Sequence, residues 1–135
     1  MFHGNVKFNW AEREEKRKQN RKKCNKKYRK TEQGNLNHRM EVSIRRALKE
    51  MKAGRKWEKL VGYSVEELIQ RLSVNFQKGM TWDRFLNGEI HIDHKKPISL
   101  FNYKTPEDQE FKDCWSLANL QPLWARDNII KSNKF

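Results

Sequence analysis

The sequence predicts an α+β fold, in which a helical, basic N-terminal half precedes a short two-stranded unit and a terminal helix. Apolar residues recur at spacings of three and four between residues 36 and 51, which is the helical period. Further along, the Asn-Gly pair at residues 87–88 is the strongest turn signal and precedes a short strand pattern. A chain of 135 residues that is 36% apolar can bury one core of ordinary size. We therefore expect one compact domain over residues 31–135, with a loosely packed arm before it.

The charge balance indicates a polyanionic partner. The formal net charge is +13 and the pI is near 9.9. Nucleic acid is the predicted partner, because lysines and arginines release counterions when they bind phosphates, and an anionic membrane surface is the weaker alternative. No stretch approaches the roughly 20 apolar residues of a spanning helix, and the N-terminus does not read as a signal peptide. The expected location is therefore cytoplasmic, in the host cell if the chain is encoded by a bacteriophage.

Residues 1–30 form the basic arm. Between residues 11 and 30, eleven basic and three acidic side chains give a net charge of +8. Without proline, glycine or an apolar face, this segment is expected to be either a solvated helix or a disordered segment that orders on DNA. The predicted nucleic-acid-binding side chains here and in the next helix are Arg17, Arg21, Lys22, Lys23, Lys26, Lys27, Arg29, Lys30, Arg45 and Arg46.

Residues 31–79 are expected to be a helical lead-in. The first helix covers residues 36–51 and ends near Gly54. A capping box at Ser64 and Glu67 then starts a second helix that runs to residue 76.

Residues 80–135 are expected to hold the strands and the functional residues. Residues 79–86 read as a turn into an aromatic segment, and residues 89–93 as a strand that Pro97 stops from continuing. A loop over residues 98–112 contains one helical turn beginning at Thr105. A short strand at residues 121–123 and a helix at residues 125–131 complete the chain.

Residues 90–97 read Ile-His-Ile-Asp-His-Lys-Lys-Pro and carry the clearest chemistry. The imidazole of His94 can accept a proton from water near pH 7. The carboxylate of Asp93 offers the hard oxygen that Mg²⁺ or Mn²⁺ prefers. His91 shares a strand face with Asp93, whereas His94 joins that face only if the strand ends and twists there. Asn128 is the best candidate for a second ligand, and Lys131 lies on the same helical face.

Together with Asn-Leu-Gln-Pro-Leu from residue 119 and Asp-Asn-Ile-Ile-Lys from residue 127, this segment resembles the HNH endonucleases of the ββα-metal, or His-Me finger, superfamily. The resemblance covers roughly residues 80–134 and is closest to small, free-standing, phage-type members. It implies a ββα-metal nuclease core that hydrolyses phosphodiester bonds in DNA. Many relatives hold a structural zinc with two CxxC pairs. This chain has neither pair, so no structural zinc is expected, and Cys24 and Cys114 are predicted to be free thiols.

Carried onto this sequence, the resemblance implies that His94 is the general base and that Asp93 binds a single divalent metal. Asn119 would be the asparagine that ties the loop between the strands to the backbone. The family position often held by histidine is Asn128 here, whose neutral amide oxygen can also bind Mg²⁺.

Several alternatives stay open at this stage. His91 is a phosphate contact, a group supporting the metal site or an ordinary strand residue, and Lys131 is a phosphate clamp or a solvated cation. The rival function is a non-catalytic DNA- or RNA-binding protein that uses the ββα unit as a groove-binding wedge. The sequence leaves monomer and homodimer equally open, together with the recognition site and the biological role.

Overall fold

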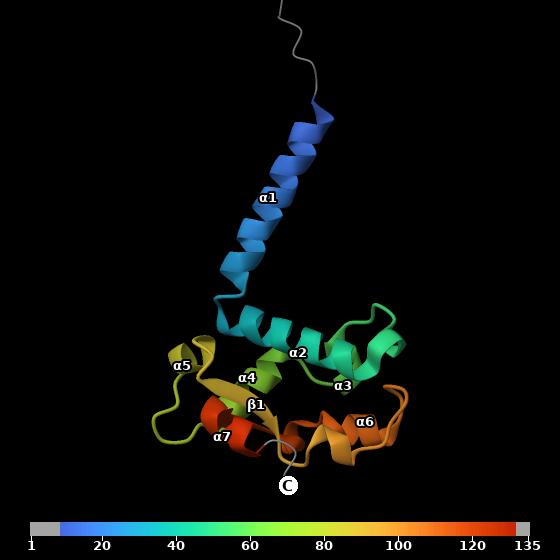
Figure 1. Ribbon diagram of the computed structural model, residues 1–135, viewed down its shortest axis with the longest axis vertical. Coiled ribbons are helices and arrows are strands. Elements are labelled where there is room, and N and C mark those ends of the chain that lie inside the picture. The colour runs from blue at the N-terminus through green and yellow to red at the C-terminus, as the bar shows by residue number, and fades with distance from the viewer. Residues whose placement is uncertain (1–8, 132–135) are drawn as a thin grey trace, which may run out of the picture.

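The computed structural model describes residues 9–131. Residues 1–8 of the predicted arm and residues 132–135 of the predicted core lie outside the described residues. Within that range there are seven α-helices and one two-stranded antiparallel sheet, so the α+β class is confirmed. Figure 1 shows α1 standing away from a body formed by the other elements.

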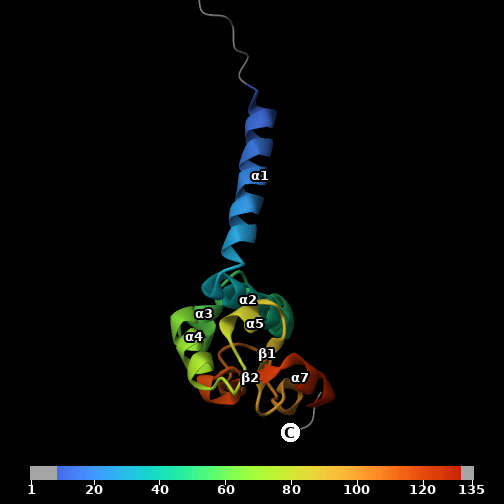
Figure 2. The ribbon, with the colours of Figure 1, turned by 90° about the vertical axis from the view of Figure 1, so that its left-hand side faces the viewer.

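Helix α1 (Trp10–Tyr28) is a solvated helix, one of the two alternatives that the sequence allowed. The side chain of Asn9 caps its N-terminus by accepting the amide N–H of Glu12 at 3.1 Å. None of its residues is buried. Two perpendicular views show it projecting from the body (Figures 1 and 2). The helix therefore exposes side chains around its circumference.

Helix α2 (Glu32–Leu48) crosses the top of the body and supplies one wall of the core. Its buried apolar residues follow the predicted helical spacing, and they are Leu36, Met40, Ile44 and Leu48. Gly34 is required at the α1–α2 turn, because a Cβ atom there would lie 1.9 Å from the carbonyl oxygen of Tyr28. The helix ends earlier than predicted, at Leu48, and a 3₁₀ turn (Lys49–Lys52) leads to Ala53 and Gly54 in left-handed conformations.

Three short helices follow: α3 (Trp57–Val61), α4 (Val65–Val74) and α5 (Trp82–Leu86). Ser64 caps α4 as predicted, with its hydroxyl accepting the amide N–H of Glu67 at 3.2 Å. The aromatic segment expected after the turn at residue 79 is a helix, which Thr81 caps by accepting the amide N–H of Arg84. The Asn-Gly pair accordingly ends α5, and Gly88 adopts a positive φ of 85° before the first strand begins.

Strand β1 (Ile90–His94) pairs antiparallel with β2 (Leu120–Trp124), and α7 (Ala125–Lys131) follows β2 directly. Both strands and α7 match their predicted positions within one residue. Between the strands, a 3₁₀ turn (Ile98–Leu100) is followed by α6 (Gln109–Cys114) and a second 3₁₀ turn (Leu117–Asn119). The helical turn expected from Thr105 thus starts four residues later. The carboxylate of Asp108 accepts the amide N–H groups of Lys104 and Thr105, which fixes a turn before the helix.

One hydrophobic cluster contains residues from α2, α4, α5, α6 and both strands. Its largest fully buried side chains are Trp57, Trp115, Phe85 and Phe111. The Tyr63 hydroxyl donates to the carbonyl oxygen of Trp115 at 2.6 Å, which joins the lead-in to the segment before β2. The two strands therefore pack against the helices of the lead-in. No helix among residues 9–131 is long and apolar enough to cross a bilayer.

Candidate active site

Asp93 is the central acidic residue of the hairpin. It is only 6% exposed. Its Oδ2 atom accepts a hydrogen bond from Lys131 Nζ at 2.7 Å and another from Gln121 Nε2 at 2.8 Å. Gln121 lies directly opposite Asp93 in the strand register, so their side chains share a face. Oδ1 of Asp93 accepts no hydrogen bond from residues 9–131, and this leaves one carboxylate oxygen available.

Lys131 is neither a solvated cation nor a free phosphate clamp in this structure. Besides the ion pair with Asp93, its ammonium group donates to the carbonyl oxygen of His94 at 2.8 Å and lies 3.4 Å from that of Lys95. A cation held by three oxygens compensates the cost of burying a carboxylate. Lys131 therefore attaches the end of α7 to the end of β1.

His94 occupies the last position of β1, where its ring meets Trp115 edge-on. The ring centroids are 4.5 Å apart and the planes are 88° apart. Burial lowers the pKa of His94 to about 4, against a raising effect from Asp93 and a further lowering from Lys131. The imidazole is therefore neutral at pH 7 and has a lone pair that can accept a proton.

Strand β1 ends at His94, one residue later than predicted. Even so, no hydrogen bond joins the side chains of Asp93 and His94, because successive residues leave a strand on opposite faces. The Nε2 atom of His94 is buried and has no hydrogen-bond partner among the described residues.

Asn119 joins the two ends of the connection between the strands. Its Oδ1 atom accepts the amide N–H of Lys96 at 2.9 Å. Its Nδ2 group donates to the carbonyl oxygens of Lys96 at 3.2 Å and Cys114 at 2.9 Å. Its own carbonyl oxygen accepts the amide N–H of Lys95 at 2.7 Å. These contacts are of the kind that the family resemblance implies for this position, and they fix the backbone immediately after His94.

Asn128 and His91 face each other across α7 and β1. Nδ2 of Asn128 lies 3.0 Å from Nδ1 of His91. With the amide nitrogen of Asn128 turned towards the ring, Nδ1 of His91 is the acceptor, which corresponds to the tautomer that carries its proton on Nε2. Burial and then the charge of Arg39 lower the pKa of His91, which favours the same neutral ring. This arrangement leaves Oδ1 of Asn128 without a hydrogen-bond partner among residues 9–131.

These side chains fit a hydrated, hard divalent cation. Asp93 and Asn128 each offer an oxygen that no described residue engages, and such oxygens suit Mg²⁺ and Mn²⁺. In the described part of the chain, no three His, Cys, Asp or Glu side chains gather to hold a metal by themselves. A cation held by either of these oxygens would keep several of its waters.

The predicted nucleic-acid-binding side chains are all exposed, but they are not gathered around the hairpin. The arm residues between 17 and 28 lie on α1, which projects away from β1 and α7 (Figure 2). Arg45 and Arg46 lie in the last turn of α2. A nucleic acid that contacts both regions and the hairpin must therefore extend along the molecule.

Three residues of the site were not predicted from the sequence. Gln121 binds Asp93, and the strand register that pairs them could have indicated it. Trp115 supports the His94 ring. Arg39 donates to the carbonyl oxygens of Phe85 at 2.7 Å and Ile90 at 3.0 Å, which anchors the start of β1 on α2. No sequence signal distinguishes this arginine from the exposed ones.

Comparison with known proteins adds a viral relative without a described function. The chain is similar to an uncharacterized protein of Acanthamoeba polyphaga mimivirus, with 30% identity over 103 residues. The match covers 73% of this chain and 44% of the viral protein, so the chain spans less than half the length of that relative. No family model and no solved structure matches.

Proposed function

We propose that this protein is a metal-dependent DNA endonuclease whose hairpin and terminal helix form an HNH core of the ββα-metal type. The observation that carries the proposal is the arrangement of four motif residues on one hairpin-helix unit. Asp93 and His94 end β1, Asn119 fixes the chain after them, and Asn128 faces β1 from α7. The similarity to a viral protein is compatible with a phage or viral setting.

The chemistry assigned to the protein side chains is proton transfer and positioning. His94 accepts the proton of the attacking water through its neutral imidazole. Asp93 and Asn128 would hold Mg²⁺ or Mn²⁺ through their available oxygens. A bound cation supplies stabilisation of the charge that develops on the phosphate and the leaving oxygen. Asn119 keeps Lys95 and Lys96 in place beside the base.

The basic surface supplies affinity for the substrate. Every residue of α1 is exposed, and its cations can contact phosphates without rearranging the core. Such contacts are independent of base sequence and weaken steeply as salt concentration rises.

A plasmid-nicking assay tests the proposal. Supercoiled DNA is incubated with the protein and Mg²⁺ or Mn²⁺, and EDTA is the chelator control. His94→Ala should lower the cleavage rate by about 10²- to 10⁴-fold, because a general base contributes that much. Asn102→Ala is the matched control, since Asn102 is exposed and belongs to no part of the site. Cleavage by His94→Ala at the wild-type rate would refute the assignment.

A second candidate, a nucleic-acid-binding protein without catalysis, is favoured by two observations. The Lys131 ammonium group already neutralises Asp93, and Nε2 of His94 is buried. This candidate predicts DNA binding with no nicking under any divalent metal. The same plasmid assay, run beside a gel-shift assay, separates the two functions.

A further inference from the structure

A cleft of about 390 Å³ lies between α2, β1 and α7, beside the candidate active site. Helix α2 contributes His38, Arg39 and Ser43 to its lining, and the hairpin-helix unit contributes His91 and Asn128. The last two side chains also face each other in the candidate site. The cleft therefore borders that site, whereas its α2 side has no role in the proposed proton transfer.

Arg39 is a partly buried cation without an acidic partner. Its guanidinium donates to the carbonyl oxygens of Phe85 at 2.7 Å and Ile90 at 3.0 Å, and it lies 4.1 Å from the centre of the Phe85 ring. No carboxylate among residues 9–131 forms an ion pair with it. Burial lowers the pKa of Arg39, which is the direction expected where no acid stabilises the charge. A guanidinium has five N–H donors, so its charge and part of its donor capacity are not used by these contacts.

The other polar groups of the lining also favour an anion. The lining contains no carboxylate. The hydroxyl of Ser43 is exposed and donates to no other residue in the range 9–131. His38 is exposed too, and the charges of Arg29 and Arg45 add to burial in lowering its pKa. Positive potential from outside the lining thus adds to that of Arg39.

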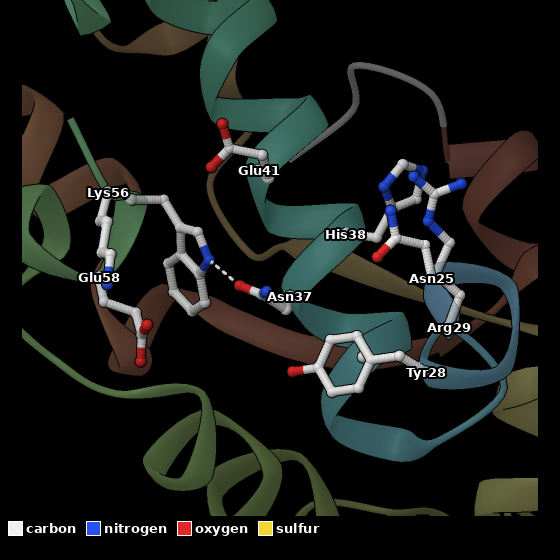
Figure 3. A pocket seen from close by; sticks show the side chains of 10 residues that line it. Asn25, Tyr28, Arg29, Asn37, His38, Glu41, Lys56 and Glu58 are labelled. Atoms are coloured by element: carbon white, nitrogen blue, oxygen red, sulfur yellow. Dashed lines mark hydrogen bonds between the residues drawn. The ribbon is translucent and has the colours of Figure 1, made fainter. Parts of the chain in front are cut away.

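A neighbouring cleft shows that this balance is not a general property of the basic surface. It has a volume of about 400 Å³ and lies between the end of α1, α2 and the start of α3. Figure 3 shows Arg29 and Lys56 around it, together with Glu41 and Glu58. Two cations against two carboxylates do not select an anion. Of the two clefts, only the one beside the candidate active site does so.

We propose that the cleft between α2, β1 and α7 binds a backbone phosphate of the DNA strand that enters the candidate active site, with Arg39 supplying the charge and Ser43 a hydrogen bond. The inference rests on the proposed function in taking DNA as the partner. A phosphodiester carries one negative charge and accepts hydrogen bonds from arginine and serine side chains. It therefore matches a lining with one uncompensated cation and a free hydroxyl. A phosphate held here fixes the strand against β1 without reading its base sequence.

Anisotropy of a fluorescein-labelled DNA duplex, measured in EDTA over a series of salt concentrations, tests this phosphate subsite without cleavage. Ser43→Glu places a carboxylate at the i, i+4 spacing from Arg39, where the two side chains can pair. The variant should raise Kd by about tenfold, because a hydrogen bond to a charged group is lost. The slope of log K against log salt should become shallower by about 0.9, the value for one phosphate. Ser43→Lys adds a cation instead, so it should tighten binding and steepen the slope.

Gln70→Glu and Gln70→Lys are the matched controls, because they make the same charge changes at an exposed position of α4. Gln70 lines neither cleft, and Figure 2 shows α4 and α7 on opposite sides of the body. General attraction between the protein and DNA predicts equal effects at residues 43 and 70. The subsite predicts much larger effects at residue 43.

The outcomes separate this inference from the proposed function. Larger effects at residue 43 than at residue 70, with unchanged urea unfolding, support the subsite; if Ser43→Glu does not fold, Ser43→Lys decides by the same comparison. Equal effects at the two positions overturn it, as does tighter binding of an RNA duplex of the same sequence. If Ser43→Glu loses affinity while the wild type fails to nick plasmid, the nuclease proposal fails alone. If the wild type nicks plasmid and both Ser43 variants bind normally, only the subsite is refuted.

Discussion

Removing the side chain of Asn119 should destabilise the protein by about 3 kcal/mol. Asn119→Ala deletes three hydrogen bonds to the backbone, one to the amide of Lys96 and two to the carbonyls of Lys96 and Cys114. Each such bond contributes about 1 kcal/mol net. Domains of this class have a free energy of unfolding of about 5–15 kcal/mol, so the variant should still fold. Urea unfolding followed by tryptophan fluorescence measures the difference.

Two further variants show whether hydrogen bonding is the cause. Asn119→Asp keeps the size and the acceptor but points a carboxylate at two carbonyl oxygens, so it should be at least as destabilising as Asn119→Ala at neutral pH. Asn102→Ala removes an exposed amide without a side-chain hydrogen bond and should change stability by less than about 0.5 kcal/mol. A loss below about 0.5 kcal/mol in Asn119→Ala would refute the reasoning.

Three other predictions concern acid stability, the thiols and α1. Because burial lowers the pKa of His94 to about 4 from an unfolded value near 6.5, the unfolded chain binds more protons between these pH values, and stability should rise with pH across that window. His94→Gln should flatten this dependence by up to about 3 kcal/mol in urea unfolding at a series of pH values. The exposed thiol of Cys24 should react at once with a thiol reagent. Burial raises the pKa of Cys114 to about 12, so this thiol should react only in denaturant. Rapid titration of both thiols in the folded protein would contradict this. Gly34→Ala should disrupt the α1–α2 turn, because its Cβ would overlap the carbonyl of Tyr28, and a fluorophore on Cys24 should then show lower anisotropy with little change in urea stability.

The sequence predicted the fold well where local signals are strong. Helical spacing placed α2, the serine at residue 64 placed α4, and β1, β2 and α7 were positioned within one residue. The turn predicted at the Asn-Gly pair is present before β1, but the helix that ends there, α5, was not predicted. The Thr81 cap and the packing of Phe85 into the core define that helix.

The candidate site could be predicted as a set of residues but not as a set of contacts. Motif spacing identified Asp93, His94, Asn119 and Asn128. The partner of Asp93 was not evident, because Lys131 reaches it only once α7 folds back along β1. The contact between His94 and Trp115 likewise depends on how the residue that follows α6 packs against the end of β1, which no local pattern encodes. Whether these residues cleave DNA remains a prediction.

The ion pair between Lys131 and Asp93 gives the hairpin a counter-ion that cannot diffuse away. In small metal-dependent domains, the metal contributes folding energy, so a chelator unfolds them. Here the ammonium group joins α7 to β1 through Asp93 and the carbonyl of His94. The hairpin can therefore stay assembled in a cell whose free magnesium falls, and EDTA should leave the unfolding transition unchanged. Any loss of activity in a chelator would then reflect the chemistry of the site and not the loss of its architecture.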